Sequence, residues 1–289
     1  MKITIIFTLL LTVFSSQIVL AEDINLGVLA PRGELKALQK WTDFGKYISD
    51  STGKTVKIIA LAPPKVLSAA SNNEVNFVLS HPAHTVALKE KYSAQQLASI
   101  NKNSGSQFAG LIITRKDKNI RTAEDLRGKK VMSMKFKVAA GAYIFQTYHL
   151  KLKGIDVHKD FASMIAGKKQ DDLVLAVKAG VIDAAFVRSG LLESMNKEGK
   201  INIDDFYVID SREDKALPLL HSTVLYPEWY LTALNGVDTE LANSVKKAAL
   251  SMTSDLPASK KAKIKGFIDP LPLDNMIQAL KTLNIAPFN

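Results

Sequence analysis

The sequence of 289 residues contains no cysteine. Disulfides, thiolate zinc sites, a cysteine nucleophile and a lipid-bearing cysteine are therefore excluded. The signatures GxSxG, HExxH and GxxxxGK[ST] are also missing, and these mark common hydrolases, metalloproteases and phosphate-binding loops. Carboxylates are frequent, but none forms an isolated pair in an apolar setting. The sequence therefore predicts a binding protein rather than an enzyme, and it implies no cofactor.

Long apolar runs are lacking except at the amino end. There Lys2 precedes the apolar run Ile3–Val13, and the small residue Ala21 follows a short second apolar stretch. This pattern predicts a Sec-type signal peptide, residues 1–21, cleaved after Ala21. An uncleaved membrane anchor is the alternative, but it needs roughly 18 or more uninterrupted apolar residues. Because Ser15–Gln17 interrupts the run, we expect export to the periplasm.

The charge balance is strongly basic, with a formal net charge of +10 that falls by one unit if Lys2 leaves with the signal peptide. In an exported protein such a balance favours anionic small ligands, or simply solubility, over nucleic acid. The lysine pairs are scattered rather than massed in one tail, which is typical of solvated surface. With 47% apolar residues and no linker or low-complexity tract, the chain can build one large domain or two lobes.

A helix–strand–helix pattern occurs twice. The copies are Val66–Leu88, VLSAASNNEVNFVLSHPAHTVAL, and Asp171–Glu193, DDLVLAVKAGVIDAAFVRSGLLE. In this register His81 of the first copy aligns with Arg188 of the second, and each follows a short apolar strand. Because ligands bind at the carboxyl ends of strands in open α/β sheets, the repeat predicts two similar α/β lobes. His81 and Arg188 should then face a shared cleft.

Two chain crossings should connect the lobes. We expect them near Thr114 and near Leu219–Leu225, with Pro227 opening a helix over Glu228–Leu234. The first lobe then comprises 22–114 and 221–289, and the second comprises 115–220. Two crossovers make a hinge about which lobes can close.

Arg188 is the first candidate for ligand contact. Its fork of N–H donors suits planar or tetrahedral oxyanions. An internal ion pair with Asp183 or Glu193 is the alternative. A second candidate is the loop that enters a helix at 135–141, because a helix start favours an anion. Its two lysines could strengthen that preference or only solubilise the loop.

The pair His81 and His84 could be read as metal ligands. No acidic cluster accompanies the pair, and structural zinc usually takes four ligands. Hydrogen bonding to a ligand or to the backbone is therefore the favoured interpretation, and no metal is expected. The stretch Asn103–Phe108, just before the first crossing, is the last candidate.

Five stretches form a recognisable series: INLGVLAPRGE, FVLSHPAHTVAL, SGSQFAGLIITRKD, TAEDLRGKKV and the second repeat copy. In this order they resemble the phosphate/phosphite/phosphonate-binding family of periplasmic solute-binding proteins of ABC transporters. The resemblance covers nearly all of the chain after the signal peptide. It implies a type-II periplasmic fold, in which two Rossmann-like lobes with two crossover hinge strands close over a small oxyanion.

The chain departs from that family at three places. The usual helix start rich in Ser and Thr reads Lys137-Val138-Ala139-Ala140-Gly141 here, Arg188 stands where an acid is usual, and an aromatic position falls near Pro63. The stretches VRSGLLESM and LLHSTVLYPEWY are instead similar to periplasmic sensor regions of histidine kinases. Some of those sense sulfur oxyanions such as tetrathionate.

We therefore expect a monomeric periplasmic solute-binding protein that captures a small anion for the membrane permease of an ABC importer. A free-standing partner of a membrane sensor kinase is the alternative. No nucleic-acid partner is expected. The predicted ligand-binding residues are Arg32, Pro63, Ser80, His81, His84, Ser106, Gln107, Phe108, Lys137, Val138, Ala139, Ala140, Lys169, Gln170 and Arg188.

Overall fold

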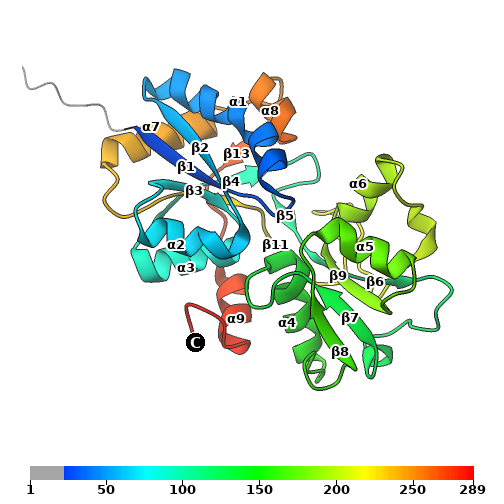
Figure 1. Cartoon of the computed structure of the whole chain (residues 1–289). Helices are drawn as coiled ribbons and strands as arrows, with labels where there is room; N and C mark the ends of the chain where they lie inside the picture. The colour runs from blue at the N-terminus through cyan, green and yellow to red at the C-terminus, as the bar shows by residue number, and fades with distance from the viewer. Residues whose placement is uncertain (1–22) are drawn as a thin grey trace, which may run out of the picture.

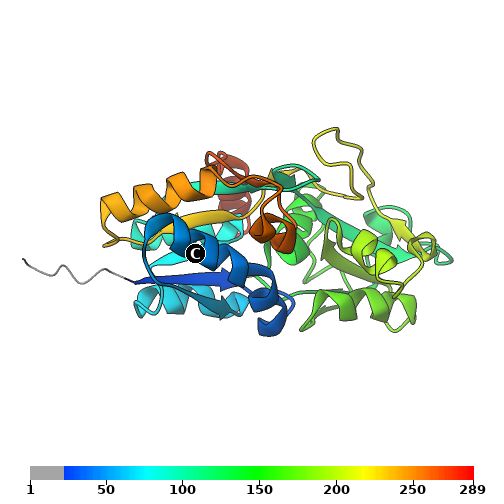
Figure 2. The ribbon, with the colours of Figure 1, turned by 90° about the horizontal axis from the view of Figure 1, so that it is seen from above.

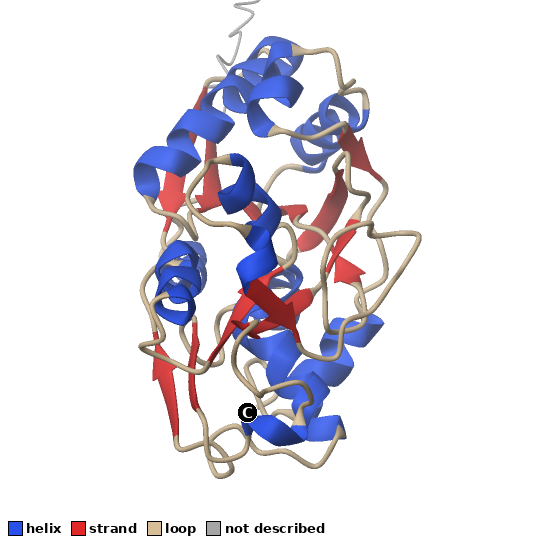
Figure 3. Ribbon diagram, turned by 90° about the vertical axis from the view of Figure 1, so that its right-hand side faces the viewer, coloured by secondary structure: helices blue, strands red, loops and turns tan. Residues whose placement is uncertain are grey.

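A computed structural model of the chain describes residues 23–289, which form two α/β lobes (Figure 1). The predicted signal peptide, 1–21, lies outside the described residues. Each lobe has its own sheet, and helices flank the strands of both sheets (Figure 3). Within 23–289, no helix has the length and apolar character needed to cross a membrane.

The first sheet has six strands in the order β13-β4-β12-β3-β1-β2. The strands are β1 Ile24–Leu29, β2 Val56–Leu61, β3 Phe77–Ser80, β4 Gln95–Asn101, β12 Tyr230–Ala233 and β13 Gly266–Ile268. β1 pairs in parallel with β2 and β3, whereas β12 lies antiparallel between β3 and β4. One face carries α1 Glu34–Thr52, α7 Thr239–Leu250 and α8 Pro257–Ala262, and the other carries α2 Val66–Ser71 and α3 Pro82–Tyr92 (Figure 1).

The second sheet has five strands in the order β10-β6-β9-β7-β8. The strands are β6 Gly110–Arg115, β7 Lys130–Ser133, β8 Ser163–Ala166, β9 Ala184–Arg188 and β10 Phe206–Val208. Its helices are the π-helix η3 Ala140–Ile144, which runs into α4 Phe145–Leu152, together with α5 Gln170–Lys178 and α6 Leu191–Lys197. Seen from above, the two lobes lie side by side (Figure 2).

The internal repeat is confirmed in the fold. Its copies form α2–β3–α3 and α5–β9–α6. β3 pairs in parallel with β1 and antiparallel with β12, and β9 pairs in parallel with β7 and antiparallel with β6. β3 and β9 therefore hold equivalent places in their sheets. Apart from its last residue, each of these two strands consists of apolar residues, because helices cover both faces of each sheet.

Two short strands connect the lobes: β5 Gln107–Phe108 and β11 Tyr226–Pro227, which pair antiparallel. The chain therefore crosses earlier than predicted at Thr114, because that residue lies within β6, between β9 and β10. The return crossing comes just after the predicted Leu219–Leu225. The predicted helix over Glu228–Leu234 is wrong, since β12 pairs there with strands on both sides and tertiary pairing overrides local helix signals.

The long helix α1 shows why local pattern predicted much of this fold. Trp41, Phe44 and Ile48 lie at helical spacing on one face and are buried against the first sheet. The helix ends at Gly53, whose φ of 67° is left-handed and whose N–H donates to the carbonyl of Ser49. The sequence periodicity and this stop residue give the same bounds within a residue or two.

One apolar cluster spans both lobes and the hinge. It joins Ala83 and Val86 of α3, Phe145 of α4 and Tyr226 of β11. The helix α9, Asp274–Thr282, belongs to the same cluster and lies between α3 and α4 (Figure 1). The Tyr226 ring stacks on that of Phe145, with centroids 3.7 Å apart.

Candidate ligand-binding site

Arg188 ends β9 where the second sheet faces the hinge. Its backbone N–H donates to Oε1 of Gln170 at 3.0 Å, so the first residue of α5 holds the strand end in place. Its guanidinium carbon lies 5.2 Å from the centre of the Phe108 ring. The side chain is 28% exposed, so part of its donor fork is accessible. Arg188, Gln170 and Phe108, all three predicted to bind the ligand, therefore lie together.

A buried acid binds Arg188 and also a lysine of the first lobe. Oε1 of Glu228 accepts hydrogen bonds from Nη2 of Arg188 at 3.2 Å and from Nζ of Lys102 at 2.5 Å. The Glu228 side chain is only 1% exposed. We call Lys102, Arg188 and Glu228 the hinge triad, because Glu228 directly follows β11 and its N–H donates to the carbonyl of Ser106 just before β5.

The hinge triad carries more positive than negative charge. Burial alone would raise the pKa of Glu228, but the charges of Lys102 and Arg188 and the Lys102 hydrogen bond bring it below its usual value. Burial, aided by the charge of Arg188, lowers the pKa of Lys102 to about 8. Burial and the charges of Lys102 and Arg188 lower the pKa of Lys40, on α1, to about 7. The surroundings of Glu228 therefore repel further cations.

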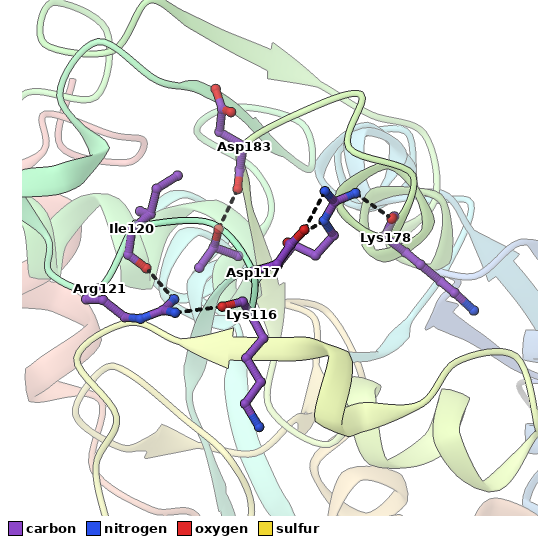
Figure 4. A network of polar contacts seen from close by, with 8 residues as sticks. Lys116, Asp117, Ile120, Arg121, Lys178 and Asp183 are labelled. Atoms are coloured by element: carbon purple, nitrogen blue, oxygen red, sulfur yellow. Dashed lines mark hydrogen bonds and ion pairs between the residues drawn. The ribbon is translucent and has the colours of Figure 1, made fainter.

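The two acids predicted to pair with Arg188 have other partners. Asp183 lies at the opposite end of β9, where its carboxylate accepts the N–H of Lys130 and its carbonyl accepts the Thr114 hydroxyl (Figure 4). Glu193 accepts the N–H of Leu220 at 2.9 Å. The alternative of an internal ion pair is therefore realised, but with Glu228, which arrives from the returning hinge strand, and not with Asp183 or Glu193.

His81 and His84 are buried at the start of α3. His81 is the N-cap, and its Nδ1 accepts the N–H of His84 at 3.3 Å. The two rings stack with centroids 3.9 Å apart. Burial lowers the pKa of His81 to about 4, and burial together with His81 lowers the pKa of His84 well below its usual value. Both rings are therefore neutral at pH 7, and the His81 ring lies near the backbone of Val138 on the other lobe.

No group of three or more His, Asp or Glu side chains within 23–289 is arranged to hold a metal ion. Two ring nitrogens of the histidine pair lack a hydrogen-bond partner in the described chain. Nε2 of His81 and Nδ1 of His84 are buried and have no partner in the described chain. Such atoms are normally satisfied in proteins, so a small polar ligand or ordered water fits this place.

The buried histidines predict a pH dependence of stability. Because the pKa of His81 lies near 4 in the folded state and near 6.5 unfolded, the unfolded state binds the proton more readily. Stability is then complete above pH 6.5 and falls as the pH drops towards 4, by about 3 kcal/mol at most from His81. His81→Asn keeps an N-cap and should reduce this loss, measured by urea unfolding at pH 7 and pH 4.5. The exposed His158→Asn is the control, and an unchanged pH slope in His81→Asn would contradict the assignment.

The helix start predicted within 135–141 lies against Arg188. The N–H groups of Val138 and Ala139 donate to the carbonyl of Lys135, so the helical run begins at Ala140. A Cβ on Gly141 would lie 2.7 Å from the Phe108 ring and 3.2 Å from Cβ of Arg188. The first N–H groups of a helix have no partner within it, and Gly141, in the first turn of η3, lies beside Cβ of Arg188.

Arg32 bridges the lobes instead of standing free. It follows β1, and its guanidinium lies 2.5 Å from Asp171 on α5 and 3.7 Å from Glu198 after α6. Burial would raise the pKa of Asp171, but hydrogen bonds and charge from Arg32, and a hydrogen bond from Lys200, bring it below its usual value. This pair holds the two lobes together at one edge of their interface.

The other predicted residues divide into two groups. Some lie at the lobe interface or hinge: Pro63 near the His84 ring, Ser80 at the end of β3 with a buried and unpartnered hydroxyl, and Ser106 and Gln107 at β5. Lys137 and Lys169 are exposed to solvent. The sequence missed Lys102 and Glu228. A charged residue inside the apolar run LYPEWY was the available signal for Glu228.

Residues 26–274 match the family model described as ABC transporter, phosphonate, periplasmic substrate-binding protein. The chain belongs to this family. Members are solute-binding proteins, and their type-II, two-lobed fold agrees with the two sheets and hinge seen here. The resemblance noted in the sequence is confirmed.

Solved structures share this fold at low sequence identity. PhnD1 of Prochlorococcus marinus, solved with methylphosphonate, has a TM-score of 0.74 and 14% identity, covering 90% of this chain and 98% of that one. A binding protein component of a Pseudomonas aeruginosa ABC phosphonate transporter has a TM-score of 0.73 and 17% identity, covering 92% of this chain and 90% of that one.

One relative of this chain is a signalling protein. The tetrathionate sensor histidine kinase of Salmonella typhimurium is 35% identical over 230 residues, which is 78% of this chain. The match spans only 38% of the kinase. The chain is therefore similar to part of a sensor histidine kinase as well as to transporter components.

Proposed function

We propose that this chain is a periplasmic solute-binding protein that captures a small oxyanion between its lobes and delivers it to an ABC importer. The observation that carries the proposal is Arg188, a partly exposed guanidinium beside Gly141 of η3. The neutral His81 ring of the first lobe lies near Val138, three residues before Gly141. A guanidinium fork and helix N–H groups are donors suited to an oxyanion. The family to which the chain belongs supports the same reading.

Ligand capture would work through closure of the lobes. A ligand shifts an open–closed equilibrium only by its differential affinity for the two states. Here His81 comes from the first lobe, and Ala140 and Arg188 come from the second. A ligand that touches all three gains contacts only when the lobes are together, and the Arg32–Asp171 pair would add to the closed state.

The second candidate is a free-standing ligand-binding partner of a membrane sensor kinase. The 35% identity to a tetrathionate sensor kinase supports it. In that case the same site would hold a sulfur oxyanion, and the loaded protein would dock on a sensor rather than on a permease. Neighbouring genes distinguish the roles, because a permease and ATPase favour import and an orphan kinase favours signalling.

A thermal-shift screen of the protein tests the ligand class directly. The panel comprises phosphate, phosphite, methylphosphonate, sulfite, thiosulfate and tetrathionate. A ligand at 100 times its Kd stabilises the folded state by roughly 2.7 kcal/mol, so we expect at least one oxyanion to raise Tm by several degrees. A panel in which only organic cations raised Tm would contradict the proposal.

A further inference from the structure

We propose that Glu228 determines the charge of the ligand, so that the site selects an oxyanion group with one negative charge over one with two. The preferred class comprises sulfonates and singly protonated phosphonates. This inference rests on the proposed function, because it concerns the same site. It assigns Glu228 a role that the local sequence pattern did not indicate, since the pattern placed this residue in a helix.

The contacts of Glu228 carry the inference. One carboxylate oxygen binds both Lys102 and Arg188, at 2.5 Å and 3.2 Å, and the side chain is 1% exposed. The second oxygen, Oε2, is buried and has no partner in the described chain. Glu228 therefore stays ionised in a place where water cannot screen it, and it neutralises one of the two positive charges beside it.

The resulting charge is one positive unit for the hinge triad. A singly charged group at the exposed part of Arg188 brings this total to zero. A doubly charged group leaves the triad and ligand together with one negative unit, beside a guanidinium that already binds the Glu228 carboxylate. Lys40, which is partly protonated at pH 7, offsets only part of that unit. Interactions between charges in such surroundings are much stronger than in water, so the second charge meets repulsion from Glu228 that solvent does not remove.

Other charged groups near the triad are cationic. Lys40 of α1 interacts with Glu228, Lys102 and Arg188, and Lys263 after α8 acts on Lys40 in turn. Lys40 is only partly protonated near pH 7, so its charge responds to the ligand and to each variant. Every comparison is therefore repeated in a Lys40→Gln background, which removes this titration.

The test compares two tetrahedral sulfur anions, sulfate with two charges and methanesulfonate with one. Their affinities are measured by calorimetry at pH 7 and constant low ionic strength, for the wild-type chain, Glu228→Gln, and the double variant Glu228→Gln/Lys102→Gln. Wild type should bind methanesulfonate more tightly. Removing the Glu228 charge should shift the sulfate-to-methanesulfonate affinity ratio towards sulfate by about tenfold or more.

The double variant is the matched control, because it restores a net charge of one positive unit while still lacking the carboxylate. Its affinity ratio should return close to that of wild type. Circular dichroism and Tm establish that each variant is folded. If Glu228→Gln does not fold, Lys102→Gln alone removes one positive charge, and the ratio should shift further towards methanesulfonate.

Three outcomes would overturn the proposal. In the first, the wild-type chain binds sulfate more tightly than methanesulfonate. In the second, the sulfate-to-methanesulfonate affinity ratio is the same in Glu228→Gln as in wild type. In the third, this ratio is the same in the double variant as in Glu228→Gln. Lack of binding of both anions by all variants also counts against it. If an oxyanion from the thermal-shift screen still bound in that case, the proposed function would stand and only the charge selection would fall.

Discussion

Arg188→Ala is expected to weaken oxyanion binding by about 30-fold or more, since loss of a charged hydrogen-bonding partner costs about 2–5 kcal/mol in a partly buried site. The fold should survive, because Glu228 keeps its hydrogen bond from Lys102 and the strand end is held through the backbone by Gln170. The measurement is calorimetric titration with the oxyanion that gives the largest shift in the thermal screen.

Arg188→Lys separates charge from geometry. Lysine keeps the positive charge but lacks the planar fork and its paired donors, so its affinity should lie between those of wild type and Arg188→Ala. Arg115→Ala provides a control on the same sheet, because Arg115 pairs with Asp117 on the surface at the far end of β6 (Figure 4). An affinity unchanged in Arg188→Ala would remove this residue from the site.

Tyr226→Ala should cause the largest loss of stability, about 3–5 kcal/mol, as large-to-small substitutions of buried aromatic residues do. The ring is 0% exposed, stacks on Phe145 and belongs to the apolar cluster that spans both lobes. Removal of the ring leaves a cavity beside the hinge strand β11. Because residues of both lobes line this cavity, neither lobe can fill it by moving alone. Urea unfolding followed by circular dichroism measures the change.

Tyr226→Phe is the matched variant, and it should be neutral or slightly stabilising. The Tyr226 hydroxyl is buried without a hydrogen-bond partner in the described chain, and removing such a group costs no bond. Burial also raises its pKa to well above the usual value for tyrosine. A loss of stability in Tyr226→Phe comparable with that in Tyr226→Ala would mean that the hydroxyl, not the ring, matters.

Two sets of ion pairs connect the lobes, and they differ in burial. Arg32 binds Asp171 where β1 faces α5, and the hinge triad joins the lobes next to β5 and β11. The first pair is partly exposed, so its contribution is small and depends on salt. The second is buried, so loss of Glu228 leaves two cations without their partner and costs more.

The sequence alone determined the architecture. Short apolar strands that end in a polar residue, each between two helices, are local patterns, and their repetition at Val66–Leu88 and Asp171–Glu193 predicted the two lobes. The same pattern placed His81 and Arg188 at equivalent strand ends. Local periodicity also gave the bounds of α1, because burial of one helical face requires it.

Only the tertiary structure decided where the chain crosses and what Arg188 binds. The stretch from Phe108 to Thr114 is one apolar run, and its division between hinge and sheet depends on which strands pair with it. Glu228 lies 40 residues from Arg188 in sequence. Strand pairing and ion pairs over such separations depend on the packing of whole elements, and no local spacing encodes them. The charge around Arg188 is therefore a property of the assembled hinge.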